Sequence, residues 1–279
     1  MRAVAALCRE LLGAAPDTVT TLVRLADRAN YRVTVRGERF VVKTDDDRRT
    51  MTNEIAGYRR AMTAGLLVPE LVAEIDDAFA IRWVDGVSLR EHGTRAAWTD
   101  AGVHVRAAHD VGGEPPFGTG FGGFNPTQPT WRAFFEAFAD EMVSTSEHDL
   151  GFPAEHAARI RAAVRAAPLD DPLLAWCLGD LQPEHVLVDP ATDRVAGIID
   201  LADQGTGDFA WDVAVLTLED GDRVDDFFAG YGAAASHRAA YAAVGPVYSV
   251  ARLVGEAGWL AEHGLPYEDN LRRALEWPL

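Results

Sequence analysis

Apolar and polar positions alternate in short runs over the first part of the chain and recur at helical spacing over the rest. Short alternating or apolar runs bounded by turn residues are typical of strands, and apolar residues at helical spacing are typical of amphipathic helices. The pattern predicts a small antiparallel sheet with helices, followed by a mostly helical remainder. The expected elements of the first part are a helix over 4–12, strands over 19–25, 31–35 and 39–43, a helix over about 50–64, and strands near 71–75 and 78–83.

From residue 85 onward the pattern is helical with loops. An aromatic stripe from Trp131 to Met142 is expected to be core rather than a ligand site. Residues 112–130 are rich in Gly and Pro, so they are expected to be neither helix nor central strand. A connector of this length is either functional or a packed crossing of the surface. Further helices are expected at 99–111, 153–167, 236–262 and 266–276, and another begins near Asp208.

One hairpin interrupts the helical remainder. Two apolar runs, 186–188 and 195–199, are separated by turn residues 189–193, which predicts a hairpin. Asp180 comes shortly before it and Asp200 ends it, so the two carboxylates are expected to lie close together. Neighbouring carboxylates raise each other's pKa unless a positive charge lies between them, and Mg²⁺ prefers oxygen ligands. The hairpin therefore indicates a metal-dependent phosphoryl-transfer site.

Lys43 is the only lysine of the chain, and the other 25 basic residues are arginine. A retained lysine indicates a site that needs a compact ammonium rather than a planar guanidinium, and contacts to nucleotide phosphates meet that description. Chance survival of one lysine is the alternative. Glu54 follows in the predicted second helix and is expected to pair with Lys43, with an ordinary surface glutamate as the alternative.

The net charge of −17 restricts the possible partners, because 26 basic residues face 43 acidic ones. Such a chain repels nucleic acid and anionic membranes and attracts polycations. We therefore expect no nucleic acid and no membrane among its partners, although general solubility also explains the charge.

Neither cysteines nor apolar runs indicate export or a membrane. Cys8 and Cys177 lie far apart without metal-ligand spacing, which is typical of reduced thiols in a cytosolic protein. No apolar run reaches the roughly 18 residues that a membrane span needs. We expect a cytoplasmic protein and a monomer.

These features together resemble the kinase-like fold and, more closely, the aminoglycoside phosphotransferase (APH) family. Residues 179–189 resemble the catalytic loop of that family, and residues 197–200 resemble its metal-binding strand end. Residues 218–220 and the preceding Asp212 are similar to the branch that phosphorylates the 2''-hydroxyl of aminoglycosides. The residues that follow the order and approximate spacing of the kinase-like fold are Lys43, Glu54, Asp180, His185 and Asp200.

The resemblance covers about residues 18–232 and implies an α+β, bilobal protein-kinase-like fold. A small antiparallel-sheet N-lobe over residues 1–84 would bind nucleotide and end in a hinge. A mostly helical C-lobe over residues 85–279 would carry the catalytic hairpin and the substrate site.

The sequence departs from the family at two places and from protein kinases, which have a Gly-rich nucleotide turn, at a third. Leu178 stands where members usually have histidine, and His185 stands where they usually have asparagine, although the 2'' branch resembles this chain there. Neutral imidazole can bind a divalent metal, whereas Mg²⁺ prefers oxygen, so His185 is expected either to be a weak ligand or to orient a water. The nucleotide turn at 27–30 lacks glycine.

The resemblance also implies roles for individual residues. Asp180 would be the catalytic base, His185 and Asp200 would bind Mg²⁺, and ATP or GTP would be the co-substrate. The nucleotide triphosphate would contact Lys43, Glu54, Asn30, Arg82, Trp83 and Val84. A cationic small-molecule substrate would contact Asp203, Glu219, Asp220 and Trp259.

Three functions are compatible with these features. The first is antibiotic-inactivating O-phosphorylation of an aminoglycoside or of a tuberactinomycin peptide such as capreomycin or viomycin. The second is a choline-, homoserine- or fructosamine-kinase-like metabolite kinase, which would need fewer acidic residues around its substrate. The third, suggested by Leu178 and His185, is a non-catalytic nucleotide- or drug-binding protein.

Overall fold

The structure is a computed structural model, and it describes residues 3–120 and 128–279. The chain forms two compact units that are not consecutive in sequence. The first unit contains residues up to Ala97 together with Glu184–Asp203, and the second contains Trp98–Pro183 with Gln204–Leu279. The predicted hairpin thus groups with the N-terminal sheet. The expected lobe boundary after residue 84 stays a prediction.

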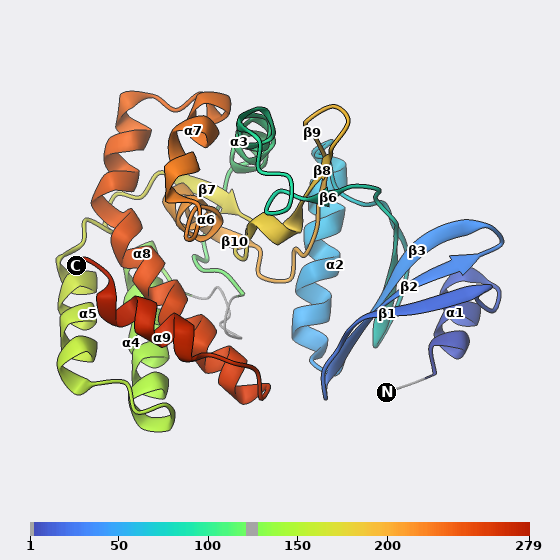
Figure 1. The fold of residues 1–279 in the computed structure, drawn as a ribbon, viewed down its shortest axis with the longest axis horizontal. Helices are drawn as coiled ribbons and strands as arrows, with labels where there is room; N and C mark the ends of the chain where they lie inside the picture. The colour runs from blue at the N-terminus through green and yellow to red at the C-terminus, as the bar shows by residue number, and fades with distance from the viewer. Residues whose placement is uncertain (1–2, 121–127) are drawn as a thin grey trace. The chain divides into compact units, whose positions relative to one another are not determined.

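A five-stranded antiparallel sheet forms the centre of the first unit (Figure 1), with the strand order β1-β2-β3-β5-β4. Apolar side chains of β2 and β3 face the N-terminal helix α1 (Val4–Leu12), and together they form a buried core. Helix α1 ends at Gly13, as predicted, and this glycine adopts the left-handed conformation with φ of 72°. The strands are β1 (Thr18–Arg24), β2 (Arg28–Val35), β3 (Glu38–Asp45), β4 (Leu71–Ile75) and β5 (Ala78–Arg82).

Helix α2 (Arg48–Thr63) follows β3 and begins at Asp47, whose side chain accepts a hydrogen bond from the Arg49 N–H. Such a cap satisfies one of the backbone donors left free at a helix start. The buried face of α2 includes Glu54 and Tyr58. The helix therefore brings a carboxylate and a hydroxyl into the interior of the first unit.

The predicted hairpin is confirmed as β8 (Val186–Asp189) paired with β9 (Arg194–Ile198). The short strand β6 (Val87–Ser88) joins it to make a three-stranded sheet and was not expected from the sequence. Gly86 precedes β6 with φ of 159°, and a Cβ there would lie 2.9 Å from the Val188 carbonyl oxygen. Only glycine lets the chain approach β8 this closely.

The second unit is mostly helical, as predicted. The aromatic stripe of α4 is confirmed as core, because Trp131, Phe135 and Phe138 are almost fully buried. Two short strands pair antiparallel beside it. The elements are α3 (Arg95–His109), which starts in the first unit, α4 (Trp131–Asp149), α5 (Ala154–Ala166), β7 (Leu174–Cys177), the 3-10 turn η2 (Pro183–His185), which ends in the first unit, β10 (Gly205–Asp208), α6 (Phe209–Leu216), the 3-10 turn η3 (Gly221–Arg223), α7 (Val224–Tyr231), α8 (Ala235–Glu262) and α9 (Glu268–Glu276).

One expectation of local structure is corrected, and another falls partly on residues that the structure does not describe. The turn expected over residues 26–30 is shorter, because β2 begins at Arg28 and Asn30 pairs with Lys43 in the sheet. The buried Ala29 side chain favours continuing the strand through this segment. The connector expected at 112–130 includes residues 121–127, which lie outside the described residues.

Across residues 3–120 and 128–279, none of the helices combines the length and apolar character that a bilayer crossing requires.

Candidate functional site

Lys43, Glu54 and Asp200 converge in the first unit. The Lys43 ammonium Nζ donates to Glu54 Oε1 at 2.6 Å and to Asp200 Oδ1 at 3.2 Å. Glu54 is buried on α2, Lys43 lies in the second half of β3, and Asp200 follows β9. The predicted pairing of Lys43 with Glu54 is therefore present, and the same ammonium also contacts Asp200.

The charges of this cluster stabilise one another. Burial disfavours the Lys43 ammonium, but the carboxylates of Asp200 and Glu54 outweigh burial and raise the pKa of Lys43 above its ordinary value. Burial likewise disfavours the Asp200 carboxylate, but Lys43 and His185 outweigh it and lower the pKa of Asp200 to about 2. Burial raises the pKa of Glu54 above its usual range, against the opposing charge of Lys43. Lys43 and Asp200 are therefore charged at neutral pH.

The backbone holds Asp200 in an unusual conformation. Its φ is 62°, a left-handed value that is uncommon outside glycine. The Asp200 N–H donates to the buried Tyr58 hydroxyl at 3.2 Å, and the Asn53 side chain donates to the Ala202 carbonyl at 2.5 Å. Helix α2 thus fixes the segment after β9 by side-chain contacts on both sides of Leu201.

His185 and Asp200 are the candidate Mg²⁺ ligands. His185 Nε2 lies 3.6 Å from Asp200 Oδ2, and 35% of the Asp200 side chain is exposed. Protein-bound Mg²⁺ usually keeps several waters and is held by one or two carboxylates plus substrate phosphates. Over the described parts of the chain, no cluster of three or more His, Cys, Asp or Glu side chains is placed to hold a metal. The pair fits a metal shared with a nucleotide and does not fit a cage made of protein ligands alone.

Asp180, the predicted base, lies in the second unit, where Arg252 and Gln182 contact its carboxylate. Arg252 Nη2 on α8 donates to Oδ1 at 2.7 Å. The Gln182 amide donates to Oδ1 at 3.0 Å and to Oδ2 at 3.1 Å. The predicted closeness of Asp180 to Asp200 stays a prediction, because the two residues belong to different units.

A buried network fixes the backbone just before Asp180. Asp212 is fully buried and accepts hydrogen bonds from the Leu178 N–H at 2.7 Å and the Gly179 N–H at 2.9 Å. It also contacts His109 Nε2 at 3.0 Å. The Trp211 indole N–H donates to the Gly179 carbonyl at 2.6 Å. Both backbone groups of Gly179 are therefore held from helix α6.

Asp208, Asp212 and His109 all have structural places in the second unit. Asp208 caps helix α6, and Asp212 lies in the first turn of that helix. His109 is buried, and its other ring nitrogen contacts the Tyr231 hydroxyl at 2.8 Å. Leu178 contributes only its backbone to this network, so the missing histidine side chain leaves these contacts intact.

The remaining residues predicted to bind nucleotide lie in or directly after the main sheet of the first unit. Asn30 is half-buried in β2 and pairs with Lys43. Arg82 is exposed and paired with Glu70 at 2.8 Å and Glu38 at 3.0 Å.

The segment that follows β5 is tied to its surroundings. The Trp83 N–H donates to the Arg39 carbonyl at 3.0 Å, and the Trp83 indole N–H donates to Asp85 at 3.0 Å. Val84 lies against Gly197, where a Cβ would come within 3.3 Å of a Val84 methyl group. The predicted nucleotide contacts of Arg82, Trp83 and Val84 stay predictions.

The residues predicted to bind substrate fall in different parts of the structure. Asp203 belongs to the first unit, and the other three belong to the second. Glu219 is exposed but paired with Arg273 at 2.7 Å, and Asp220 precedes η3. Trp259 stacks on His263, with ring centroids 4.3 Å apart. The joint substrate role of these four side chains stays a prediction.

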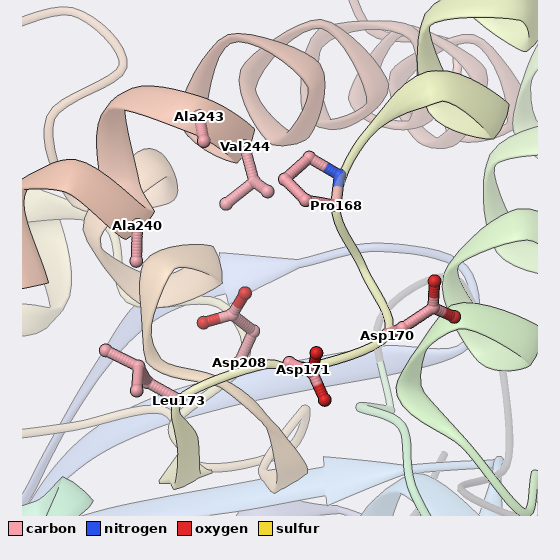
Figure 2. Close-up of a pocket in the computed structure, with 8 residues that line it drawn as sticks. All are labelled: Pro168, Asp170, Asp171, Leu173, Asp208, Ala240, Ala243 and Val244. Carbon is pink, nitrogen blue, oxygen red and sulfur yellow. The ribbon is translucent and has the colours of Figure 1, made fainter. Parts of the chain in front are cut away.

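A pocket of about 260 Å³ lies elsewhere in the second unit, between the segment before β7 and helix α8 (Figure 2). No residue predicted to carry the chemistry lines this pocket. Its lining consists of Pro168, Asp170, Asp171, Leu173, Asp208, Ala240, Ala243 and Val244.

Comparison with known proteins identifies the family. Residues 18–247 match the family model APH, described as the Phosphotransferase enzyme family. That match spans far more than half of the 279 residues. The chain belongs to this family. The protein is therefore a phosphotransferase, and the kinase-like fold predicted from the sequence is confirmed. Its placement in the 2'' branch is not decided by this match and stays a prediction.

Solved structures similar to this phosphotransferase share its fold at low sequence identity. A protein from Thermobifida fusca YX-ER1, described as a fructosamine-3-kinase, has 24% identity and a TM-score of 0.72, covering 98% of this chain and 99% of its own. A thermostable mutant of aminoglycoside phosphotransferase APH(4)-Ia has 18% identity and a TM-score of 0.74, covering 98% of this chain and 96% of its own. Macrolide 2'-phosphotransferase MphH from Brachybacterium faecium has 15% identity and a TM-score of 0.69, covering 100% and 99%. A search of curated proteins found no match to this phosphotransferase.

Proposed function

We propose that the phosphotransferase transfers the γ-phosphoryl group of ATP or GTP to a hydroxyl of a cationic small molecule. The observation that carries this proposal is the Lys43 ammonium held between the Glu54 and Asp200 carboxylates. A buried ammonium oriented in this way suits the phosphates of a nucleotide. Complexes of APH(4)-Ia with AMP-PNP and hygromycin B provide a precedent for a nucleotide and an antibiotic as ligands of this fold.

Each residue of the mechanism has one task. Lys43 binds the α and β phosphates and is held in place by Glu54. Asp200 and His185 would hold Mg²⁺, which would neutralise charge on the phosphates. Asp180 orients the acceptor hydroxyl and takes its proton. The acceptor oxygen forms a bond to the γ-phosphorus, the bond from that phosphorus to the bridging oxygen breaks, and the nucleoside diphosphate leaves with the electron pair.

Precise positioning is the main contribution that a protein makes to this reaction, because a phosphoryl group in transfer needs neutralisation and alignment. Helix α2 holds both members of the Lys43–Asp200 pair, because Tyr58 contacts Asp200 and Glu54 contacts Lys43. This fixed geometry suits the alignment that phosphoryl transfer needs.

The substrate class follows from charge. The net charge of −17 attracts polycations, and Asp203, Glu219 and Asp220 would receive the ammonium groups of an aminoglycoside or of a tuberactinomycin peptide. Trp259 would stack on a sugar ring. Phosphorylation at the 2''-hydroxyl is the regiochemistry that the sequence favours for an aminoglycoside.

A metabolite kinase is the second candidate, and one observation favours it. Glu219 is neutralised by Arg273, and the nearby Asp225 contacts Arg238 at 2.5 Å. Several acids of this region are therefore paired within the chain, which lowers the charge offered to a polycation. A fructosamine or choline substrate carries less positive charge and needs fewer acids.

A panel of acceptors tests the proposal. The purified protein is given ATP or GTP with Mg²⁺ and, one at a time, aminoglycosides, capreomycin, viomycin, fructosamine, homoserine or choline, and release of nucleoside diphosphate is measured. Turnover with an antibiotic supports the first candidate, and turnover with a metabolite alone supports the second. Nucleotide binding without turnover on any acceptor contradicts catalysis. If the wild-type protein binds neither ATP nor GTP, the role given to Lys43 is contradicted.

A further inference from the structure

Arg252 is a buried cation that neither the motif pattern nor the mechanism above uses. It lies on α8, and only 2% of its surface is exposed. Its guanidinium donates to Asp180 Oδ1 at 2.7 Å and lies 3.8 Å from Glu256, one helical turn further on. Burying a guanidinium is costly unless it is paired and hydrogen-bonded. The contact with Asp180 is therefore a specific interaction and not an incidental surface pair.

The position of Arg252 on α8 makes it a rigid support. Its neighbours Val250, Ala251, Leu253 and Val254 are all fully buried, so the helix cannot shift here without disturbing the core. The guanidinium is planar and presents its donors in a fixed geometry. A carboxylate bonded to it is held in direction as well as in distance.

Gln182 alone cannot provide the same support. Its amide bonds both oxygens of Asp180, but it lies only two residues further along the same loop. A contact inside one loop moves with that loop. Arg252 lies 72 residues away in sequence and connects the Asp180 side chain to a different element.

Two anchors thus divide the task of fixing Asp180. Asp212 holds the backbone of Leu178 and Gly179 from α6, and Arg252 holds the side chain from α8. Asp212 fixes the position of the backbone just before Asp180, and Arg252 fixes the direction of the Asp180 carboxylate. Catalysis by a positioned base depends on both, because a misplacement of about 1 Å can cost roughly 10²-fold in rate.

We propose that Arg252 is a positioning residue that aims the Asp180 carboxylate at the acceptor hydroxyl. This inference rests on the proposed function, in which Asp180 is the base. It predicts a loss in kcat with little change in the KM for nucleotide, since no role of Arg252 involves Lys43 or Asp200. It also predicts that the effect of Arg252 passes through Asp180.

A double-mutant cycle tests the inference on the full-length protein. Arg252→Met, Arg252→Lys, Asp180→Ala and the two combined variants are assayed with nucleotide and the acceptor that the panel identifies. We expect Arg252→Met to lower kcat by about 10-fold to 10²-fold and Arg252→Lys to fall between it and the wild type. In the Asp180→Ala background, either change should cost little more, because residues that act as a unit are non-additive.

Arg272→Met is the matched control, because Arg272 is an exposed arginine on α9 that pairs with Asp269 and Glu276. It should leave kcat and KM unchanged. If Arg252→Met fails to unfold cooperatively, Arg252→Lys carries the cycle, since it keeps a charge beside Asp180.

The outcomes separate this inference from the proposed function. Unchanged kcat in Arg252→Met, or losses that add fully to those of Asp180→Ala, would overturn the positioning role alone. Wild-type activity in Asp180→Ala, or a wild type that turns over no acceptor, would instead overturn the proposed function.

Discussion

The Lys43 cluster and the Asp180 cluster hold charged groups in opposite ways. In the first unit one ammonium lies between two carboxylates, and all three residues were indicated by the sequence. In the second unit the Asp180 carboxylate is held by Arg252, which is distant in sequence, and the backbone just before Asp180 is held by the buried Asp212. The first cluster is organised to bind a charged ligand, and the second is organised to aim one catalytic atom.

This difference explains why the sequence indicates Lys43 and Asp180 but not Arg252, the side chain that holds Asp180. Lys43 is unique in composition, and Asp180, His185 and Asp200 fall in a short segment. Arg252 is one of 25 arginines and comes from a helix with no distinguishing pattern. A residue that supports another through a contact distant in sequence does not belong to a recognisable local motif.

The largest expected effect is at Asp180, and it tests whether the second cluster is catalytic. Asp180→Ala removes the base, and positioned acid–base catalysis contributes about 10²–10⁴-fold. We expect kcat to fall by about that factor while the dissociation constant for nucleotide, measured by calorimetry, stays close to wild type. Asp222→Ala, an exposed acid in η3, is the control. A near-wild-type kcat in Asp180→Ala would show that the two clusters do not differ in the way proposed.

The next effect is at Lys43 and tests whether the first cluster binds phosphate. Lys43→Met leaves Glu54 and Asp200 facing each other without a cation, so nucleotide affinity should fall by about 10-fold or more, because hydrogen bonds to charged groups contribute about 1.5–3 kcal/mol. Lys43→Arg keeps the charge but not the compact shape, and we expect it to recover little, because the two side chains are not interchangeable. Full activity in Lys43→Arg would remove the argument drawn from the single lysine.

Opposite pH dependences sharpen the comparison between the two units. Lys43 lowers the pKa of Asp200 to about 2 against the effect of burial, so its stabilising contribution is present above the unfolded pKa of about 3.9 and is lost as pH falls toward the folded pKa. Screening of this partly exposed group limits the contribution to about 1 kcal/mol. The free energy of unfolding in urea, compared between wild type and Asp200→Asn across pH 3–7, checks the sign.

Asp208 should behave in the reverse sense. Burial raises its pKa to about 6, while Ala210 and Tyr248 donate hydrogen bonds that oppose the rise. The folded state therefore holds a proton that the unfolded state releases near pH 3.9, so stability falls as pH rises between the two values, by on the order of 3 kcal/mol. Asparagine can still cap α6. Asp208→Asn should therefore remove this pH dependence, even if the substitution also changes the free energy of unfolding by the same amount at every pH. A wild-type unfolding free energy that rises over this interval would contradict the assignment.

The smallest effect concerns substrate charge. If a polycation contacts Glu219, Glu219→Gln should raise its KM by about 2- to 5-fold, because exposed ion pairs contribute at most about 1 kcal/mol. Arg273→Ala should lower that KM, because it releases Glu219 from its present partner. Steady-state assays at low and high salt check the electrostatic origin. An unchanged KM in both variants would favour a substrate that does not use this acid.

Much of the fold follows from local pattern. Helix α1 and the β8–β9 hairpin match their predicted positions because apolar spacing and turn residues agree there. Strand β10 was missed because its sequence, Gly-Thr-Gly-Asp, has no apolar alternation, and it exists through pairing with β7. Asn30 was expected in a turn. The structure places it in β2, because its pairing with Lys43 outweighs its local preference.

The site was predictable where chemistry and spacing coincide and not where tertiary contacts decide. The pairing of Lys43 with Glu54 was expected and is present. The contact of His109 with Asp212 joins residues 103 apart in sequence, and nothing near either residue indicates it. Leu178 was noted as a departure, but only the structure shows that its backbone N–H provides the contact with Asp212.

The single lysine also has a practical consequence for labelling. Amine-directed acylating reagents attack the neutral amine, and the Lys43 amine is held charged by its two carboxylates. Mild amine acylation should therefore spare Lys43, the only lysine of the sequence, and should leave the proposed nucleotide site unmodified.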